Sequence, residues 1–260
     1  MNRSPTQPII IGNWKMNKTI DEALHFVKGL LPLVQDAPSR LCLAVPFTSI
    51  RPIADLCKGT TTHVGGQNMH DVEAGAFTGE IAGRMLREAG AYFVLLGHSE
   101  RRRFFAESNE LINKKLKRAL KDGLIPVLCI GETALEREQG NTENVLATQL
   151  SLGLEGLNAD QAKNVVVAYE PVWAIGTSLV ASPETAEEAH KYCRHYLGQL
   201  FNQEIAAGIP IIYGGSANDA NAQALLEQQD VDGLLVGTAS LDCQTFSKIL
   251  HCSASKTLNT

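Results

Sequence analysis

The chain has 260 residues, of which 44% are hydrophobic, and it carries a net charge of −5 with a sequence pI near 5.8. This length and apolar content are enough for one large core or two small ones. The acidic balance argues against nucleic-acid binding, and no apolar run is long enough for a signal peptide or a membrane span.

Six cysteines are spread along the chain without a Cys-x-x-Cys pair. This spacing indicates neither a disulfide framework nor a metal cluster. A reducing cytoplasm is the expected compartment, and no metal or other cofactor is expected.

Short β-rich apolar runs recur along the chain and predict eight strands. They are Ile9–Ile11, Leu41–Val45, Thr62–Gly65, Tyr92–Leu96, Ile125–Ile130, Val165–Tyr169, Ile209–Tyr213 and Leu234–Val236.

Helix signals follow most of these runs and are weakest after the second and third. Thr19 with Glu22 forms a capping-box pattern. Ser108 precedes an amphipathic helix predicted over Asn109–Lys121, and Ser182 with Pro183 precedes one predicted over Glu184–Phe201.

Eight strand–helix units predict a (β/α)8 barrel, which is the expected fold class. A doubly wound sheet is the competing fold, but it often carries a Gly-x-Gly-x-x-Gly turn after its first strand. Here the first strand runs into Gly-Asn-Trp-Lys at 12–15, so the barrel is favoured. No linker divides the chain, and residues 1–260 are read as a single domain.

Polar residues and Gly-rich turns collect where the predicted strands end, which is where barrels place their active sites. They are Asn13, Lys15, Gln67, Asn68, His98, Glu100, Glu170, Ser216, Gly237 and Thr238.

Glu170 is the base candidate in this set. It ends a buried strand, and the apolar segment after Pro171 offers groups that would cover it and exclude water. The alternative is a carboxylate in a structural salt bridge beside a turn.

His98 precedes a predicted short helix whose dipole favours a neutral imidazole, and a neutral imidazole donates to a substrate carbonyl. Lys15 is either a solvated lysine or a positive charge for an anion. Arg101 and Arg102 are expected in structural ion pairs, and Glu100 is expected to pair with them or to position Lys15.

Two Gly-rich turns follow the last two strands, Tyr-Gly-Gly-Ser at 213–216 and Val-Gly-Thr-Ala at 236–239. Glycine lets the backbone approach a ligand, and free N–H groups there bind anionic oxygens. Barrels often bind phosphate after strands seven and eight, although such a turn is more often only a turn.

Six motifs resemble the triosephosphate isomerase family, in its order and at its spacing over nearly the whole chain. They are Gly-Asn-Trp-Lys-Met-Asn (12–17), Gly-Ala-Phe-Thr-Gly-Glu (75–80), Gly-His-Ser-Glu-Arg-Arg (97–102), Pro-Val-Leu-Cys-Ile-Gly-Glu (126–132), Tyr-Glu-Pro-Val-Trp-Ala-Ile-Gly-Thr (169–177) and Tyr-Gly-Gly-Ser (213–216).

The resemblance implies an isomerase that interconverts dihydroxyacetone phosphate and D-glyceraldehyde 3-phosphate in glycolysis and gluconeogenesis. It implies Glu170 as the base, His98 as the neutral electrophile, Lys15 as the cation and Asn13 as a substrate ligand. The expected phosphate ligands are the N–H groups of Gly176, Ser216, Gly237 and Thr238.

The same resemblance implies a mobile lid over Pro171–Ala181 and a homodimer formed through the loop Gly65 to Gly79. Thr78 in that loop is expected to reach the pocket of a second subunit near Asn13. No nucleic acid or membrane partner is expected.

The chain departs from the family pattern at Ser178, Leu179 and Thr238. The first two bear on lid motion, and the β-branched Thr238 bears on phosphate geometry. Two other functions stay open at this point: a Schiff-base aldolase that uses Lys15, and a barrel that binds metabolites without catalysis.

Overall fold

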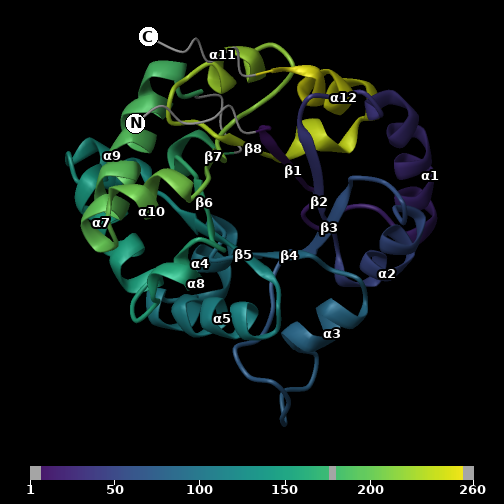
Figure 1. Cartoon of the computed structure of the whole chain (residues 1–260), viewed down its shortest axis with the longest axis horizontal. Helices are drawn as coiled ribbons and strands as arrows, with labels where there is room; N and C mark the ends of the chain where they lie inside the picture. The colour runs from purple at the N-terminus through teal and green to yellow at the C-terminus, as the bar shows by residue number, and fades with distance from the viewer. Residues whose placement is uncertain (1–6, 176–179, 254–260) are drawn as a thin grey trace.

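The computed structural model describes residues 7–175 and 180–253, and its centre is a closed barrel of eight parallel strands in chain order. Figure 1 shows the strands surrounded by an outer ring of helices. The strands are β1 (Ile9–Asn13), β2 (Arg40–Ala44), β3 (His63–Gly66), β4 (Phe93–Leu96), β5 (Ile125–Ile130), β6 (Val166–Tyr169), β7 (Ile211–Tyr213) and β8 (Gly233–Val236). The (β/α)8 prediction is therefore confirmed.

The α-helices lie outside the barrel and cover the strands. They are α1 (Ile20–Leu30), α2 (Phe47–Leu56), α3 (Gly83–Glu88), α4 (Ser99–Phe105), α5 (Asn109–Lys121), α6 (Ala134–Glu138), α7 (Thr142–Gly153), α8 (Ala159–Ala162), α9 (Pro183–Leu200), α10 (Gln203–Gly208), α11 (Ala222–Leu226) and α12 (Cys243–His251). Short 3-10 turns are η1 (Leu31–Val34), η2 (Val172–Ala174) and η3 (Thr238–Leu241).

The predicted helix starts are confirmed by their caps. Thr19 and Glu22 form the reciprocal capping box of α1. Ser108 accepts from the N–H of Leu111 at the start of α5, and Ser182 caps α9. The helices after the second and third strands, α2 and α3, have the weakest sequence signals, and both begin without a side-chain cap.

The core has two layers because side chains alternate along each strand. Ile10 packs outward against the helices, whereas Ile11 points into the barrel. Inside, Ile11 is joined by Phe93, Leu95, Ile212 and other apolar side chains, so the barrel is filled.

All eight strands are parallel, so their carboxyl ends meet at one end of the barrel. Between β3 and α3 the chain projects away from the barrel (Figure 1). Among the described residues, no helix has both the length and the apolar character that a membrane span requires.

Candidate active site

Strand alternation decides which residues point into the mouth of the barrel. Asn13 lies two positions beyond the interior Ile11, and Glu170 lies two beyond the interior Ala168. In the same way, Gly214 lies two positions beyond the interior Ile212, and Gly237 lies two beyond the interior Leu235. Polar groups from β1 and β6 therefore face an opening left by two glycines.

Glu170 is 1% exposed and is held from both its backbone and its side chain. Its N–H donates to the carbonyl of Ile130 at 2.7 Å, which extends the sheet by one residue before Pro171 ends it. Its Oε2 accepts from the N–H of Ser99 at 2.9 Å, at the start of α4. Its Oε1 has no hydrogen-bond partner among the described residues.

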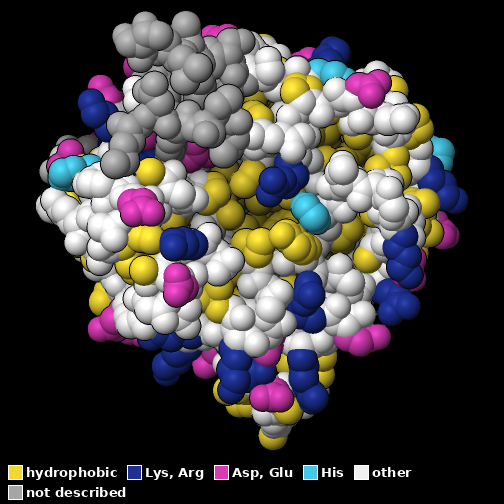
Figure 2. Space-filling model, viewed as in Figure 1, with side chains coloured by type: hydrophobic (Ala, Val, Ile, Leu, Met, Phe, Trp, Pro, Cys, Tyr) yellow, Lys and Arg dark blue, Asp and Glu magenta, His cyan; other side chains and the backbone are white. Residues whose placement is uncertain are grey.

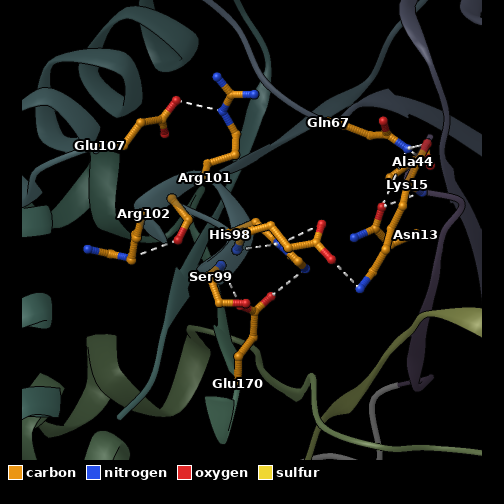
Figure 3. A network of polar contacts seen from close by, with 12 residues as sticks. Asn13, Lys15, Ala44, Gln67, His98, Ser99, Arg101, Arg102, Glu107 and Glu170 are labelled. Atoms are coloured by element: carbon orange, nitrogen blue, oxygen red, sulfur yellow. Dashed lines mark hydrogen bonds and ion pairs between the residues drawn. The ribbon is translucent and has the colours of Figure 1, made fainter. Parts of the chain in front are cut away.

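His98 caps the N-terminus of α4 and faces this free carboxylate oxygen. Its Nδ1 accepts from the N–H of Glu100 at 3.3 Å, which assigns the proton of a neutral imidazole to Nε2. Nε2 lies 3.3 Å from Oε1 of Glu170. Figure 3 shows His98, Ser99 and Glu170 converging on one point.

Lys15 brings positive charge to the same mouth. Its Nζ lies 2.6 Å from Oε1 of Glu100, so of the two roles expected for Glu100 the contact with Lys15 is the one observed. The backbone N–H of Lys15 donates to Oδ1 of Asn13 at 3.1 Å. The two side chains of the Lys15–Glu100 pair are 32% and 41% exposed, which leaves the ammonium accessible to a small anion.

These residues surround a pocket of about 390 Å³, large enough for a small metabolite. Its walls include Asn13, Lys15, His98, Ala174, Ile175, Gly214, Gly215, Ser216, Ala217, Asn218, Leu235, Gly237, Thr238 and Ala239. Both Gly-rich turns therefore line the space beside Lys15, as predicted. The remaining predicted ligand, Gly176, lies outside the described residues, as do Ser178 and Leu179.

The apolar segment after Glu170 rests on a buried carboxylate, Glu132, for which the sequence predicts no role. Glu132 is fully buried and accepts from Nε1 of Trp173 at 2.8 Å and from the hydroxyl of Tyr169 at 3.2 Å. Arg137 approaches the same oxygen at 3.3 Å and lies over the Trp173 ring. In the sequence, the feature that could have pointed to a role for Glu132 was its position just beyond the buried strand β5.

The two arginines after His98 have different partners. Arg101 pairs with Glu107 at 2.6 Å, which confirms its expected ion pair. The prediction for Arg102 is wrong, because it donates to the carbonyls of Gly97 and Cys129 at 2.8 and 2.9 Å and to Asn109. A guanidinium that is largely buried among strand ends satisfies its donors with backbone oxygens, and this burial lowers the pKa of Arg102.

No group of three or more His, Cys, Asp or Glu side chains in residues 7–175 and 180–253 is placed to hold a metal ion. Lys15 and His98 line the pocket, and the Glu170 carboxylate lies 3.3 Å from His98 Nε2, so the site combines a carboxylate, an imidazole and an ammonium. This set suits proton transfer beside a carbonyl, with the ammonium and the free N–H groups of the turns offsetting negative charge.

Comparison with known proteins gives one consistent result. The family model described as triosephosphate isomerase matches residues 8–253. A triosephosphate isomerase from Protochlamydia amoebophila is 51% identical over 251 residues, covering 96% of this chain and 95% of its own. One from Acetivibrio thermocellus is 47% identical over 241 residues, covering 93% and 96%.

A solved structure agrees with the sequence matches. The crystal structure of triosephosphate isomerase from Bartonella henselae superposes with a TM-score of 0.85 at 36% identity. The match covers 94% of this chain and 98% of that one.

Proposed function

This chain belongs to the triosephosphate isomerase family of enzymes, and on that premise we propose that it interconverts dihydroxyacetone phosphate and D-glyceraldehyde 3-phosphate through an enediolate. The reaction belongs to glycolysis and gluconeogenesis. The observation that carries the proposal is the 3.3 Å approach of Glu170 Oε1 to Nε2 of His98, beside a pocket lined by His98 and Lys15.

Glu170 is the base in this proposal. It removes a proton from the hydroxymethyl carbon of the ketone and returns it to the neighbouring carbon, which produces the aldehyde. His98 donates from Nε2 to the carbonyl oxygen and then exchanges protons between the two oxygens of the enediol. Burial of both side chains supports these roles, because fixed groups act more strongly where water is excluded.

Lys15 and Asn13 bind the substrate, and the ammonium of Lys15 offsets the negative charge of the enediolate and the phosphate. The phosphate lies between the turns after β7 and β8, held by the N–H groups of Ser216, Gly237 and Thr238 together with Gly176. The position of these turns beside Lys15 supports this arrangement.

Pro171–Ala181 acts as a lid, and its closure excludes water and prevents loss of phosphate from the enediolate. The contacts of Trp173 with Glu132 and Arg137 support a defined resting position for its first part. We place the whole chain, residues 1–260, in a single cytoplasmic (β/α)8 domain that needs no cofactor.

The test is a coupled isomerase assay on the wild type and on Glu170→Gln. The amide keeps the shape of the side chain but accepts no proton, so kcat should fall by roughly 10²–10⁴-fold. Glu155→Gln, which changes an exposed carboxylate outside the pocket wall, is the control for general effects of the substitution. Equal rates for wild type and Glu170→Gln would refute the base assignment.

A Schiff-base aldolase remains the alternative chemistry for Lys15. The 2.6 Å contact of Nζ with Glu100 favours a fixed positive charge over an amine nucleophile. Borohydride trapping of a substrate adduct on Lys15 would support the aldolase, and failure to trap one would count against it.

We also propose that the enzyme is a homodimer formed through the loop Gly65 to Gly79. The loop projects from the barrel, with hydrophobic side chains at the end of the projection (Figure 2). Phe77, the neighbour of Thr78 in the sequence, is 47% exposed. Met16, which follows Lys15 of the pocket wall in the sequence, is 96% exposed. In the dimer, Thr78 reaches the partner's Asn13.

Phe77→Asp should dissociate the dimer, because a charge would be buried in the interface. Sedimentation velocity measures the change. Leu200→Asp is the control, since Leu200 is 38% exposed on α9. A wild type that sediments as a monomer at every concentration would exclude the dimer.

A further inference from the structure

Lys15 has an unfavourable backbone conformation for a residue with a side chain. Its φ is +51°, in the left-handed region that favours glycine. Such strain persists only where neighbouring groups hold the backbone in place. Within the loop itself, the N–H of Lys15 donates to Asn13 Oδ1, which secures one side of the peptide chain.

Gln67 secures the other side. Its Nε2 lies 2.9 Å from the carbonyl oxygen of Lys15 and 3.1 Å from that of Ala44. These are the two bonds that an amide NH₂ group can donate. A third oxygen, Oδ1 of Asn13, lies 3.4 Å away. Figure 3 shows this amide beside Lys15, Asn13 and Ala44.

The position of Gln67 in the fold explains how one side chain reaches all three oxygens. Gln67 directly follows β3, Ala44 ends β2, and Asn13 ends β1. Three consecutive strands of the barrel thus place their carboxyl ends around the Gln67 amide. Lys15 is then fixed at both ends, its backbone by Gln67 and its ammonium by Glu100 at 2.6 Å.

We propose that Gln67 is a positioning residue that holds Lys15 in its binding geometry. The inference rests on the proposed function for the catalytic role of Lys15. The two N–H donors of the Gln67 amide are taken up by the carbonyls of Lys15 and Ala44, so Gln67 acts through the Lys15 backbone rather than on the substrate. Without its amide, the Lys15 backbone relaxes from the left-handed region and the ammonium leaves its place.

The test uses Gln67→Met, which keeps the length of the side chain and removes the N–H donors. A displacement of about 1 Å in a catalytic group costs up to about 10²-fold in rate. We therefore expect kcat/KM for glyceraldehyde 3-phosphate to fall by about 10- to 100-fold. Gln228→Met is the matched control, because Gln228 also donates its amide to a backbone carbonyl, that of Ala224 at 3.2 Å. Gln228 lies just beyond the end of α11 and outside the pocket wall.

A double-mutant cycle separates positioning from a merely structural role. If Gln67 acts through Lys15, Gln67→Met should change kcat/KM by less than about twofold in a Lys15→Ala background. The urea midpoint of Gln67→Met should match that of Gln228→Met. Fully additive effects of Gln67→Met and Lys15→Ala on kcat/KM would overturn the proposal. A loss of activity in Gln67→Met that is explained by a lower urea midpoint would also overturn it.

A binding measurement distinguishes failure of this proposal from failure of the proposed function. Inorganic phosphate is titrated into the wild type, Gln67→Met and Gln228→Met by calorimetry. Weaker phosphate binding in Gln67→Met alone would support the positioning role even if the wild type showed no isomerase activity. Equal phosphate affinity in all three proteins would overturn it.

Discussion

Gly214→Ala is the substitution that tests the packing around the base most directly. Gly214 follows β7, and its N–H donates to the carbonyl of Tyr169 at 2.7 Å. A Cβ added there would lie 2.9 Å from Cγ of Glu170 and 3.3 Å from the Tyr169 carbonyl oxygen. Tyr169 ends β6 and Glu170 follows it, so the new methyl group has no free space toward β6.

The size of the effect follows from these distances. Ordinary contact begins at 3.4 Å, so the methyl group and Glu170 Cγ are too close by about 0.5 Å. Cγ is in the middle of the side chain, so its displacement shifts the carboxylate relative to Ser99 and His98. Since misplacement by about 1 Å costs about 10²-fold, we expect kcat/KM to fall by about 10- to 100-fold. Overpacking should also destabilise the fold by about 1–3 kcal/mol.

Initial rates in the coupled isomerase assay and urea unfolding measure the two effects. Gly208→Ala is the matched control, because a Cβ at Gly208 meets nothing within 4 Å. It should keep wild-type activity and a wild-type or slightly higher urea midpoint. If Gly214→Ala keeps kcat/KM within about twofold of wild type, the base is not held by the packing described above.

Three further outcomes are expected. If the Thr238 side chain crowds the phosphate site, Thr238→Gly should lower the KM for glyceraldehyde 3-phosphate, and Thr238→Val should leave that KM unchanged. A higher KM in both variants would instead indicate that the Thr238 hydroxyl binds the phosphate. Burial lowers the pKa of His190 to about 4, so between pH 6.5 and pH 4 the unfolded chain takes up a proton that the folded one does not. Stability should fall by up to about 3 kcal/mol over that window, and His190→Gln should unfold in urea with a flatter pH dependence; parallel curves would contradict the assignment. Ala106 has a φ of +52° at the end of α4, so Ala106→Gly should raise the unfolding free energy by about 1 kcal/mol, and a lower urea midpoint would exclude strain there.

The order and type of the strands were predictable because each depends on a local pattern. All eight predicted strands are present, and β5 has the predicted bounds. The differences at the ends have physical causes. β7 begins at Ile211 because Pro210 has no N–H to donate to the sheet. β1 continues past its apolar run to Asn13, since pairing with β2 involves the backbone of polar residues as well.

The candidate site was predictable in its membership but only partly in its contacts. Asn13, Lys15, His98 and Glu170 were recognisable as polar residues at strand ends. The partners of Arg102 were predicted wrongly, because a sequence does not show that its guanidinium is surrounded by backbone carbonyls. Gln67 was visible at a strand end but had no assignable role.

The sequence by itself determined the alternation of strands and helices, the helix caps and the family motifs, because each depends on residues only a few positions apart. Only the tertiary structure decided that Ser99 holds one oxygen of Glu170 while His98 faces the other, and that Gln67 supports the strained backbone of Lys15. Those contacts join residues 52 to 72 positions apart. They exist because closure of the barrel fixes the register of every strand and brings the carboxyl ends together at one end.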